Sequence, residues 1–244
     1  MKARQTLRLA GLCGLLLLLS LPASAQQLTL DLGEGPGLAS RSVQLLVLVT
    51  VLSIVPGLAI MVTCFPFIVT VLSILRQGIG LQQAPPNMLI ISLAMFLTWF
   101  VMEPVLIAAW TQGVEPFTAE EIDLATAFAR TSAPFREFMS NRTNPDTFAY
   151  LDALRPREAT GIPDAPLSLL VPSFLLSEMQ RAFEIGFLIF LPFLIIDLVV
   201  SAILMSMGMM MVPPAVVSLP FKLAFFVVAD GWGLIASALV RSYM

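Results

Sequence analysis

The sequence predicts an all-α subunit built from hydrophobic helical hairpins, with a small polar segment between them. Of its 244 residues 58% are hydrophobic and only 12% are charged, whereas an average soluble domain has about a quarter charged residues. Long apolar runs occupy residues 43–75, 88–110, 185–212 and 215–240. Each run exceeds the roughly 20 residues that a helix needs to cross a bilayer. A polar turn joins the first two runs and a methionine-rich turn joins the last two, and each turn contains a pair of prolines.

The composition argues against several classes of function. The 13 Lys and Arg against 16 Asp and Glu give a net charge of −3, which leaves no basic footprint for nucleic acid. Histidine is absent, so the usual general base, zinc ligand and pH switch are missing. Asp197 and Asp230 lie in successive apolar runs, but neither follows the Gly-x-Gly sequence of intramembrane aspartyl proteases. We therefore expect no catalytic residue, no bound metal and no cofactor.

Residues 1–25 have the organisation of a secretory signal peptide. A positively charged start precedes an apolar core over residues 9–21 and the small-residue site Ala23-Ser24-Ala25. The alternative, a first transmembrane helix, is disfavoured because the apolar core is too short. Cleavage after Ala25 would leave Cys64 as the one remaining cysteine, so the mature chain could form no intrachain disulfide. A polar lead over residues 26–42 precedes the first apolar run.

Residues 43–110 are expected to form the first hydrophobic hairpin. Pro56 and Pro66 interrupt the run 43–75, and a proline removes a helical hydrogen bond and kinks or breaks the helix. We therefore expect a kinked helix or two packed segments, followed by a polar turn over residues 76–87.

Residues 111–184 differ from the rest in holding eleven of the sixteen acids and six arginines, a local net charge of −5 (six minus eleven). We expect a water-facing helical segment, with an amphipathic helix over residues 119–129 whose first turn is acidic. If the signal peptide is removed and the four apolar runs cross the membrane, this segment and the C-terminus lie on the periplasmic side.

Near the end of this segment Glu178, Arg181 and Glu184 recur every three residues and would form one charged stripe on a helix. A solvated face is the usual explanation of such a stripe, and ion pairs between subunits are the alternative.

Residues 185–244 form the second expected hairpin, and a methionine-rich loop connects its two runs. Clustered thioethers allow three interpretations. First, thioethers are soft and adaptable, so copies of the loop around an axis could form a deformable seal. Second, thioethers are ligands for Cu(I), so the loop could belong to a copper transporter. Third, the methionines could simply end an apolar helix. The methionines of the loop are Met205, Met207, Met209, Met210 and Met211.

Four ionisable residues lie within or at the ends of the apolar runs: Glu103, Asp197, Lys222 and Asp230. A charge at the centre of a bilayer costs at least about 2.5–3.5 kcal/mol, so such residues are normally paired or kept from lipid. Folding at residues 209–214 would bring Asp197 and Lys222 to similar depth, and we expect them to form a buried pair. The alternative is that Lys222 snorkels to the interface while Asp197 caps a kink.

Several long strings together resemble one known family. SFLLSEMQRAFEIGF (173–187) leads into LPFLIID (191–197), and MSMGMMMVPP (205–214) leads into LPFKL (219–223). LRQ (75–77) and QQAPPN (82–87) precede them. In this order the strings resemble the FliP/SctR type III export-gate family, in its flagellar branch, over about residues 43–235.

The resemblance implies a function in protein secretion. Five copies, with FliR and FliQ subunits, would form a closed helical or ring-like oligomer at the centre of the flagellar basal body, on the periplasmic side of the bacterial inner membrane. Unfolded rod, hook and filament subunits would pass through it, with FlhB and FlhA as further partners of the export apparatus. The hydrophobic hairpins would then be largely buried against other subunits.

The resemblance also implies roles for single residues. The five loop methionines correspond to a gasket that narrows the pore, Asp197 and Lys222 to buried polar partners, and Glu178, Arg181 and Glu184 to assembly contacts. Two other functions remain open from the residues alone: a transporter whose methionine loop binds Cu(I), and a proton-coupled channel that uses Asp197.

Overall fold

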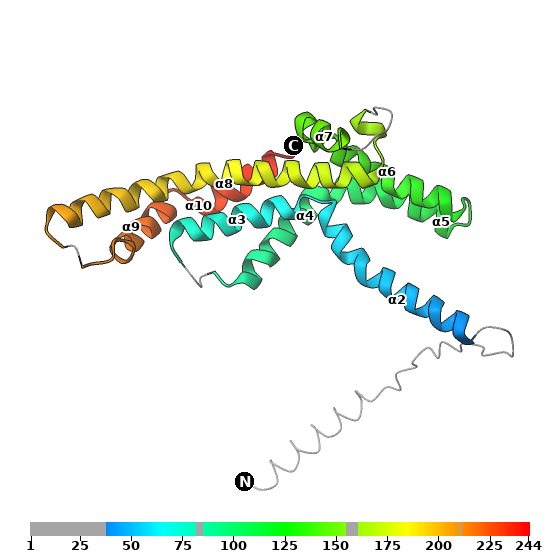
Figure 1. Ribbon diagram of the computed structural model, residues 1–244, viewed down its shortest axis with the longest axis horizontal. Coiled ribbons are helices and arrows are strands. Elements are labelled where there is room, and N and C mark those ends of the chain that lie inside the picture. The colour runs from blue at the N-terminus through cyan, green and yellow to red at the C-terminus, as the bar shows by residue number, and fades with distance from the viewer. Residues whose placement is uncertain (1–37, 82–84, 155–160, 210) are drawn as a thin grey trace, which may run out of the picture. The chain divides into compact units, whose positions relative to one another are not determined.

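The computed structural model describes residues 38–81, 85–154, 161–209 and 211–244 (Figure 1). Within these ranges the regular elements are helices and there is no strand, which confirms the predicted all-α class. The chain divides into two compact units, residues 1–50 and 51–244, and the packing described below lies within the second. The predicted signal peptide lies outside the described residues.

The elements are α2 (Leu38–Met61), α3 (Phe65–Ile79), α4 (Asn87–Ala109), a π-helical turn (Trp110–Val114), α5 (Glu115–Thr118), α6 (Leu124–Arg142), α7 (Pro145–Asp152), a 3₁₀ turn (Ile162–Asp164), α8 (Leu167–Ser206), α9 (Pro214–Val228) and α10 (Gly231–Arg241).

The first apolar run is broken into the two helices α2 and α3. Pro66 stands in the first turn of α3, where the missing N–H of a proline is tolerated. The Thr63 hydroxyl accepts a hydrogen bond from the Phe65 N–H at 3.3 Å and so satisfies a free donor at the start of α3. Pro56 is accommodated inside α2. The break therefore lies at the second of the two prolines, and α3 ends at Gly80, whose φ of +87° suits glycine.

Helix α3 forms the centre of the core, beside α4 and α8. It lies along α8 (Figure 1), and Thr70 meets Met179 while Gly78 lies against Phe190 and Phe193. Burial of so many aliphatic and aromatic side chains supplies most of the stability of this unit. The buried hydrophobic residues of α3 are Phe67, Ile68, Val71, Leu72, Leu75 and Ile79.

A glycine on α8 permits this packing. A Cβ at Gly186 would lie 2.4 Å from Ile74 Cδ1 and 3.3 Å from Ile74 Cβ. A side chain at residue 186 would force Ile74 to shift, and interiors packed to crystal-like density resist added atoms.

The acidic helix expected over residues 119–129 begins later, at Leu124. Asp123 caps it, since its carboxylate accepts the Thr126 N–H at 3.3 Å, and an aspartate at this position stops the helix from extending backward. Interaction with Thr126 also lowers the pKa of the Asp123 carboxyl. Glu120, at φ +57°, belongs to the preceding turn. Helix α6 then continues through Pro134 to Arg142.

The second hairpin differs from its sequence-based outline in two places. Helix α8 runs for 40 residues from Leu167 to Ser206, across the expected boundary at residues 184/185, and contains Pro172 and Pro192. The apolar run 215–240 is instead broken between α9 and α10, which are bent by 61°. Asp230 lies at this break with a φ of +48°, a left-handed conformation that ends a right-handed helix.

Three of the described helical stretches are long and apolar enough to cross a membrane, and the bent pair α9 and α10 would be a fourth. By length and composition this agrees with the predicted apolar runs. The three stretches are Val43–Met61, Asn87–Thr118 and Leu167–Ser206.

We predict that Gly186→Leu lowers the free energy of unfolding by about 1–3 kcal/mol, because its side chain would overlap Ile74. Thermal unfolding of the detergent-purified protein measures this. Gly57→Ala is the control, since no atom lies within 4 Å of its Cβ position and alanine in a helix interior gains up to about 1 kcal/mol over glycine. An unchanged melting temperature for Gly186→Leu would show that α3 and α8 are not tightly packed.

Candidate functional site

The methionine-rich loop lies between α8 and α9, at the tip of the second hairpin. Helix α8 ends in a left-handed turn at Gly208, whose φ is +75°. The Gly208 N–H donates to the Met205 carbonyl and the Met209 N–H to the Leu204 carbonyl, each at 3.0 Å. These bonds satisfy the carbonyls at the helix end, and Pro213 and Pro214 then begin α9.

The methionines of this loop are exposed rather than packed within the subunit. Met211 is 98% exposed, and even the least exposed of the described four, Met209, is 41% exposed. Met210 lies outside the described residues. An exposed run of large apolar side chains at a loop tip is unusual for a monomeric soluble protein and marks a surface that another surface covers. The other two described members are Met205 and Met207.

An apolar cavity of about 520 Å³ lies between α8 and α9 behind the loop. Met207 and Met209 reach into its lining, together with aliphatic residues of α8 and with Phe221 of α9. The loop methionines therefore border an open apolar space, in which unbranched thioethers can adopt several packings.

Asp197 and Lys222 are brought together across the second hairpin. Lys222 Nζ lies 2.6 Å from Asp197 Oδ2 and also donates to the Gly78 carbonyl of α3 at 3.1 Å. Ser218 donates to the other carboxylate oxygen at 2.6 Å. Lys222 is 5% exposed, so its charge is held by fixed oxygens, as a buried ion requires. The pair forms within one subunit and joins α8 and α9 to the end of α3.

Glu178 lies inside the subunit, in a second charged cluster. It is fully buried. Arg142 Nε, at the end of α6, donates to Glu178 Oε1 at 3.0 Å, and the Tyr243 hydroxyl donates to the other oxygen. The carboxylate therefore has a charged and a neutral donor, which compensates for its removal from water. The contacts of Glu178 are thus made within the subunit, where sequence reasoning expected a solvated or intersubunit stripe.

Arg142 and Tyr243 attach the C-terminus to this cluster. Arg142 Nη1 donates to the Ser242 carbonyl at 2.7 Å, and its guanidinium carbon lies 4.0 Å from the centre of the Tyr243 ring. That ring also packs edge-on against Phe67 of α3. Sequence reasoning missed both residues, because Arg142 lies 36 positions and Tyr243 lies 65 positions from Glu178. The available signal was a tyrosine just beyond the last apolar run.

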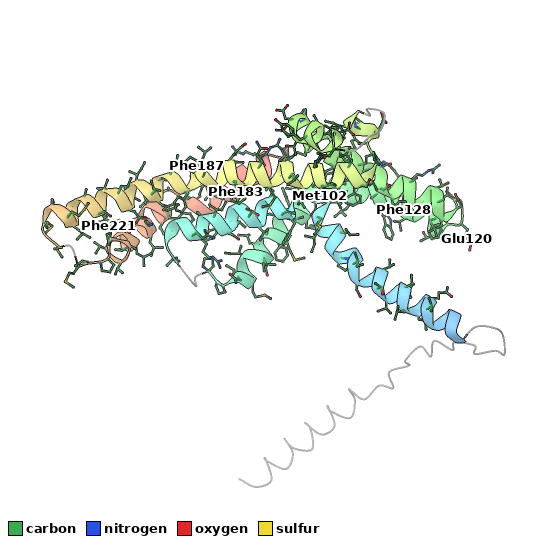
Figure 2. The ribbon with its side chains drawn as sticks, in the orientation of Figure 1. Met102, Glu120, Phe128, Phe183, Phe187 and Phe221 are labelled. Atoms are coloured by element: carbon green, nitrogen blue, oxygen red, sulfur yellow. The ribbon has the colours of Figure 1, made fainter. Side chains whose placement is uncertain are left out.

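The rest of the charged stripe faces outward. Arg181 is partly exposed and its Nη1 lies 3.6 Å from Glu178 Oε1, while Glu184 is exposed and accepts a hydrogen bond from Gln180. Phe183 and Phe187 project from α8 one turn apart (Figure 2) and are both exposed. Arg181 and Glu184 therefore border an apolar face of α8.

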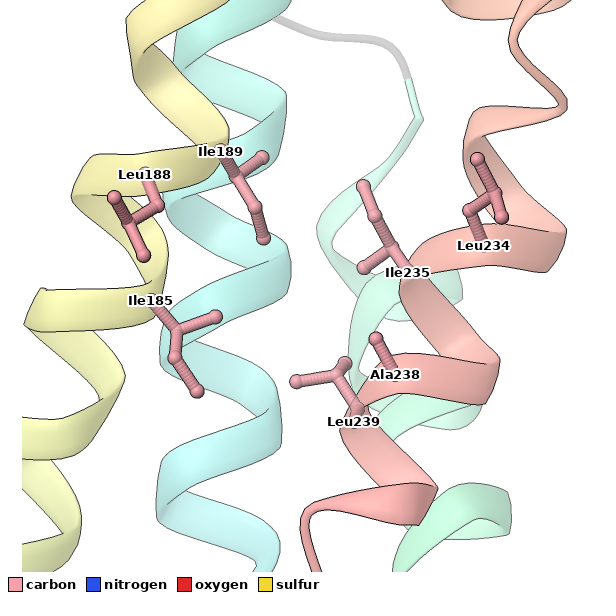
Figure 3. A pocket seen from close by; sticks show the side chains of 7 residues that line it. All are labelled: Ile185, Leu188, Ile189, Leu234, Ile235, Ala238 and Leu239. Atoms are coloured by element: carbon pink, nitrogen blue, oxygen red, sulfur yellow. The ribbon is translucent and has the colours of Figure 1, made fainter.

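A smaller apolar cavity of about 300 Å³ separates α8 from α10. Ile185 and Ile189 of α8 face Ile235 and Leu239 of α10 across it (Figure 3). Its lining contains no ionisable side chain, so it offers no group for acid–base chemistry.

Cys64 is buried at the start of α3. Burial raises the pKa of its thiol to about 12. Such a thiol is not ionised near neutral pH and is therefore a packed hydrophobe rather than a nucleophile or metal ligand.

Long apolar helices, internal charge pairs and an exposed methionine loop define the class of the molecule: a helical membrane-protein subunit that presents apolar surface beyond its own core. The chain belongs to the FliP family, whose model matches residues 48–239.

Three relatives agree with this assignment. The chain is 48% identical to the flagellar biosynthetic protein FliP of Caulobacter vibrioides, over 91% of this chain and 85% of that protein. It is 46% identical to the protein of the same name from Rhizobium meliloti, over 91% and 93% of the two chains. The identity to the flagellar biosynthetic protein FliP of Bacillus subtilis is 44%, over 86% and 96%.

We predict that Tyr243→Phe destabilises the protein by about 1–3 kcal/mol, because it leaves one oxygen of the buried Glu178 carboxylate without its donor. Burial, reinforced by the Glu178 charge, raises the pKa of Tyr243 in the folded state. Its contribution to stability is therefore complete below the unfolded-state pKa, about 10, and is lost as the pH rises above that value.

Denaturant unfolding at pH 8 and at pH values above 10 measures both effects. Tyr150→Phe is the matched control, since Tyr150 is 76% exposed. The wild type should lose stability at high pH more steeply than Tyr243→Phe, and equal slopes would contradict the position assigned to Tyr243.

Proposed function

We propose that this chain is a core subunit of the flagellar type III protein export gate. The proposal combines family membership with the printed names of the relatives, which are flagellar biosynthetic proteins. In this function the chain is required for assembly of the flagellum. It forms part of a conduit, in the inner membrane and on its periplasmic side, through which unfolded rod, hook and filament subunits leave the cell.

The exposed methionine loop carries the proposal. A side chain that is 98% exposed, as Met211 is, gains nothing from the fold of its own subunit. Copies of the loop around an axis would bury these thioethers against each other and close a pore to ions and water. Because thioethers repack easily, the same ring can yield to a passing polypeptide and close behind it.

The partners proposed for the gate are other copies of the chain, about five by family resemblance, with FliR and FliQ subunits and with FlhB and FlhA of the export apparatus. The exposed face of α8 supports contact with such partners, because Phe183 and Phe187 are both exposed there. Arg181 and Glu184, at the border of this face, are the proposed assembly contacts. Glu178 supports this face from inside the subunit, since its carboxylate lies near Arg181.

The proton-coupled channel is less well supported. Asp197 is held by Lys222 at 2.6 Å and by Ser218 at 2.6 Å. Both oxygens of this carboxylate are therefore occupied by donors of the same subunit, and the contact of Lys222 with the Gly78 carbonyl fixes the pair against α3. We therefore assign the pair a structural role, as the joint between α8, α9 and α3.

We predict that replacing both Met207 and Met209 by serine raises the uptake of a small membrane-impermeant dye several-fold above the wild-type level. The dye uptake is that of cells that contain the assembled gate. Serine is shorter and polar, so the ring would admit water where thioethers exclude it. Dye uptake and secreted flagellin are measured in the same cultures. Met88→Ser is the control, because Met88 is more exposed than either loop methionine but lies on α4.

Unchanged dye uptake with unchanged flagellin secretion would contradict the methionine seal. Loss of copper uptake in the double variant, with secretion intact, would instead support the Cu(I) transporter.

A further inference from the structure

Both sides of the second hairpin are interrupted at the same level. On one side Pro192 lies inside α8, where it cannot donate a hydrogen bond to the carbonyl four residues earlier. On the other side Asp230 separates α9 from α10. The ring of Phe193, the residue after Pro192, lies 6.4 Å from the ring of Phe226. A Cβ at Gly231 would lie only 2.2 Å from that same Phe226 ring, so the two interruptions face each other across the hairpin.

The interruption at Asp230 separates two complete helices. The Asp230 N–H donates to the Val227 carbonyl at 3.1 Å at the end of α9, and the Leu234 N–H donates to the Asp230 carbonyl at 3.0 Å at the start of α10. A change of angle at Asp230 therefore leaves the hydrogen bonds inside both helices in place. Its φ of +48° is uncommon for a residue other than glycine. Hinges are typically a few residues at the ends of elements that absorb such backbone changes.

Beyond the two interruptions the hairpin is tied together as one unit. We call this unit, residues 192–230 with the methionine loop at its tip, the arm, and we call the earlier part of α8 together with α10 the base. Asp197 of α8 accepts hydrogen bonds from Lys222 and Ser218 of α9, each at 2.6 Å. The Phe193 ring also meets the Phe225 ring edge-on, with 6.1 Å between their centres. The two helices of the arm therefore move together.

On the base side of the interruptions α8 and α10 leave space between them. The cavity of about 300 Å³ begins here, and Ile189 of α8 faces Ile235 of α10 across it (Figure 3). The chain beyond α10 is anchored, since the Tyr243 hydroxyl donates to Glu178 of α8. The base is thus fixed far from the interruptions, and little packing between its helices resists bending next to them.

A buried polar contact holds the arm against the end of α3. Lys222 Nζ donates to the Gly78 carbonyl of α3 at 3.1 Å and to Asp197 Oδ2 of the arm at 2.6 Å. Lys222 is 5% exposed, and a hydrogen bond shielded from water is strengthened electrostatically. Because the ammonium group has two acceptors, the bond to Gly78 can open while the ion pair inside the arm keeps the charge compensated. The contact with Gly78 therefore has the properties of a catch.

We propose that the arm turns as a unit about a double hinge at Pro192 and Asp230, and that the hydrogen bond from Lys222 to the Gly78 carbonyl is the catch that holds it in the observed position. The bonds inside α9, α10 and the arm stay intact during this turn. The consequence rests on the proposed function: a turn of the arm carries the methionine loop away from the neighbouring copies and opens the seal, and the return of the arm closes it.

Double electron–electron resonance on the detergent-purified full chain measures the turn. Spin labels are attached to cysteines that replace Leu176 on the base and Val216 on the arm, which are 51% and 68% exposed. Cys64 is buried and stays unlabelled. At 1.5 Å per residue, the stretch of α8 from Pro192 to its end is roughly 20 Å long. A turn of a few tens of degrees therefore shifts the distance between the labels by roughly 5 Å or more.

The hinge is tested by Asp230→Gly. Glycine adopts left-handed and right-handed conformations about equally, so we expect a second distance in addition to the wild-type distance. If the bend were only a fixed feature of the fold, glycine would fit it without strain and the distance would stay single. Glu120→Gly is the matched control, because Glu120 also has a positive φ, of +57°, but lies in the turn before α6 (Figure 2).

The second side of the hinge is tested in the Asp230→Gly background. Adding Pro192→Ala allows the missing hydrogen bond of α8 to form and stiffens that helix, so the second distance should disappear. Adding Pro172→Ala instead is the matched control, because Pro172 lies inside the same helix but in the base. The second distance should persist in that variant.

The catch is tested by Lys222→Met in the otherwise unchanged chain. We expect the fraction of molecules at the second distance to rise several-fold, because the bond to Gly78 is lost. Ser218→Ala is the control, since Ser218 also contacts Asp197 but does so inside the arm, and it should leave this fraction unchanged. If Lys222→Met does not fold, as judged by thermal unfolding, the glycine and alanine variants decide the proposal alone.

A single, wild-type distance in Asp230→Gly would overturn the hinge. A second distance that survives the addition of Pro192→Ala would overturn the assignment of Pro192 as its other side, and a folded Lys222→Met with the wild-type distance would overturn the catch. The distances are measured without an export assay, so their failure would leave the test of the methionine seal untouched.

Discussion

The close approach of α8 to α3 is the contact on which the rest of the structure depends. Gly186 leaves room for Ile74, so α3 can lie against α8 and bury most of its own length. The Lys222 contact to the Gly78 carbonyl and the edge-on contact of Tyr243 with Phe67 both end on α3. If α8 were held further away, these two distant parts of the chain would lose their shared support.

The subunit pairs the charges of two buried clusters internally and leaves much of its apolar surface open. Asp197 and Lys222 hold one end of the hairpin, and Glu178 with Arg142 holds the C-terminus. Exposed aromatic and aliphatic residues remain on α4 and α8, and methionines on the loop. Burial of such surface is favourable at roughly 25 cal/mol per Å². Contact of this exposed apolar surface with lipid or with another protein therefore stabilises the subunit. In the proposed gate most of this contact is with protein.

The sequence was sufficient for features that depend on local pattern. Apolar runs predicted the long helices, and Pro56 and Pro66 predicted the broken first run, although only the structure shows that the break falls near Pro66. The bend at Asp230 was missed, because a left-handed residue within an apolar run leaves no compositional trace. The helix start at Leu124 was missed by five residues because Asp123 was assigned to the first turn rather than to the cap.

The candidate site was predictable only in part, because some of its contacts depend on local spacing and others on tertiary packing. The hairpin turn set the depth of Asp197 and Lys222, so their proximity could be proposed from spacing alone. Arg142 and Tyr243 reach Glu178 through tertiary packing across 36 and 65 residues, which no periodicity encodes. Sequence spacing likewise placed Glu178 on a stripe but could not show that α6 and the C-terminus cover it.

The central claim is that the exposed apolar surface is interface between subunits. Native mass spectrometry of the detergent-purified chain, alone and co-expressed with FliR and FliQ from the same bacterium, tests it most directly. The account predicts a discrete oligomer that gains the partner subunits on co-expression. A stable monomer that ignores both partners would contradict it and would leave lipid as the cover of these helices.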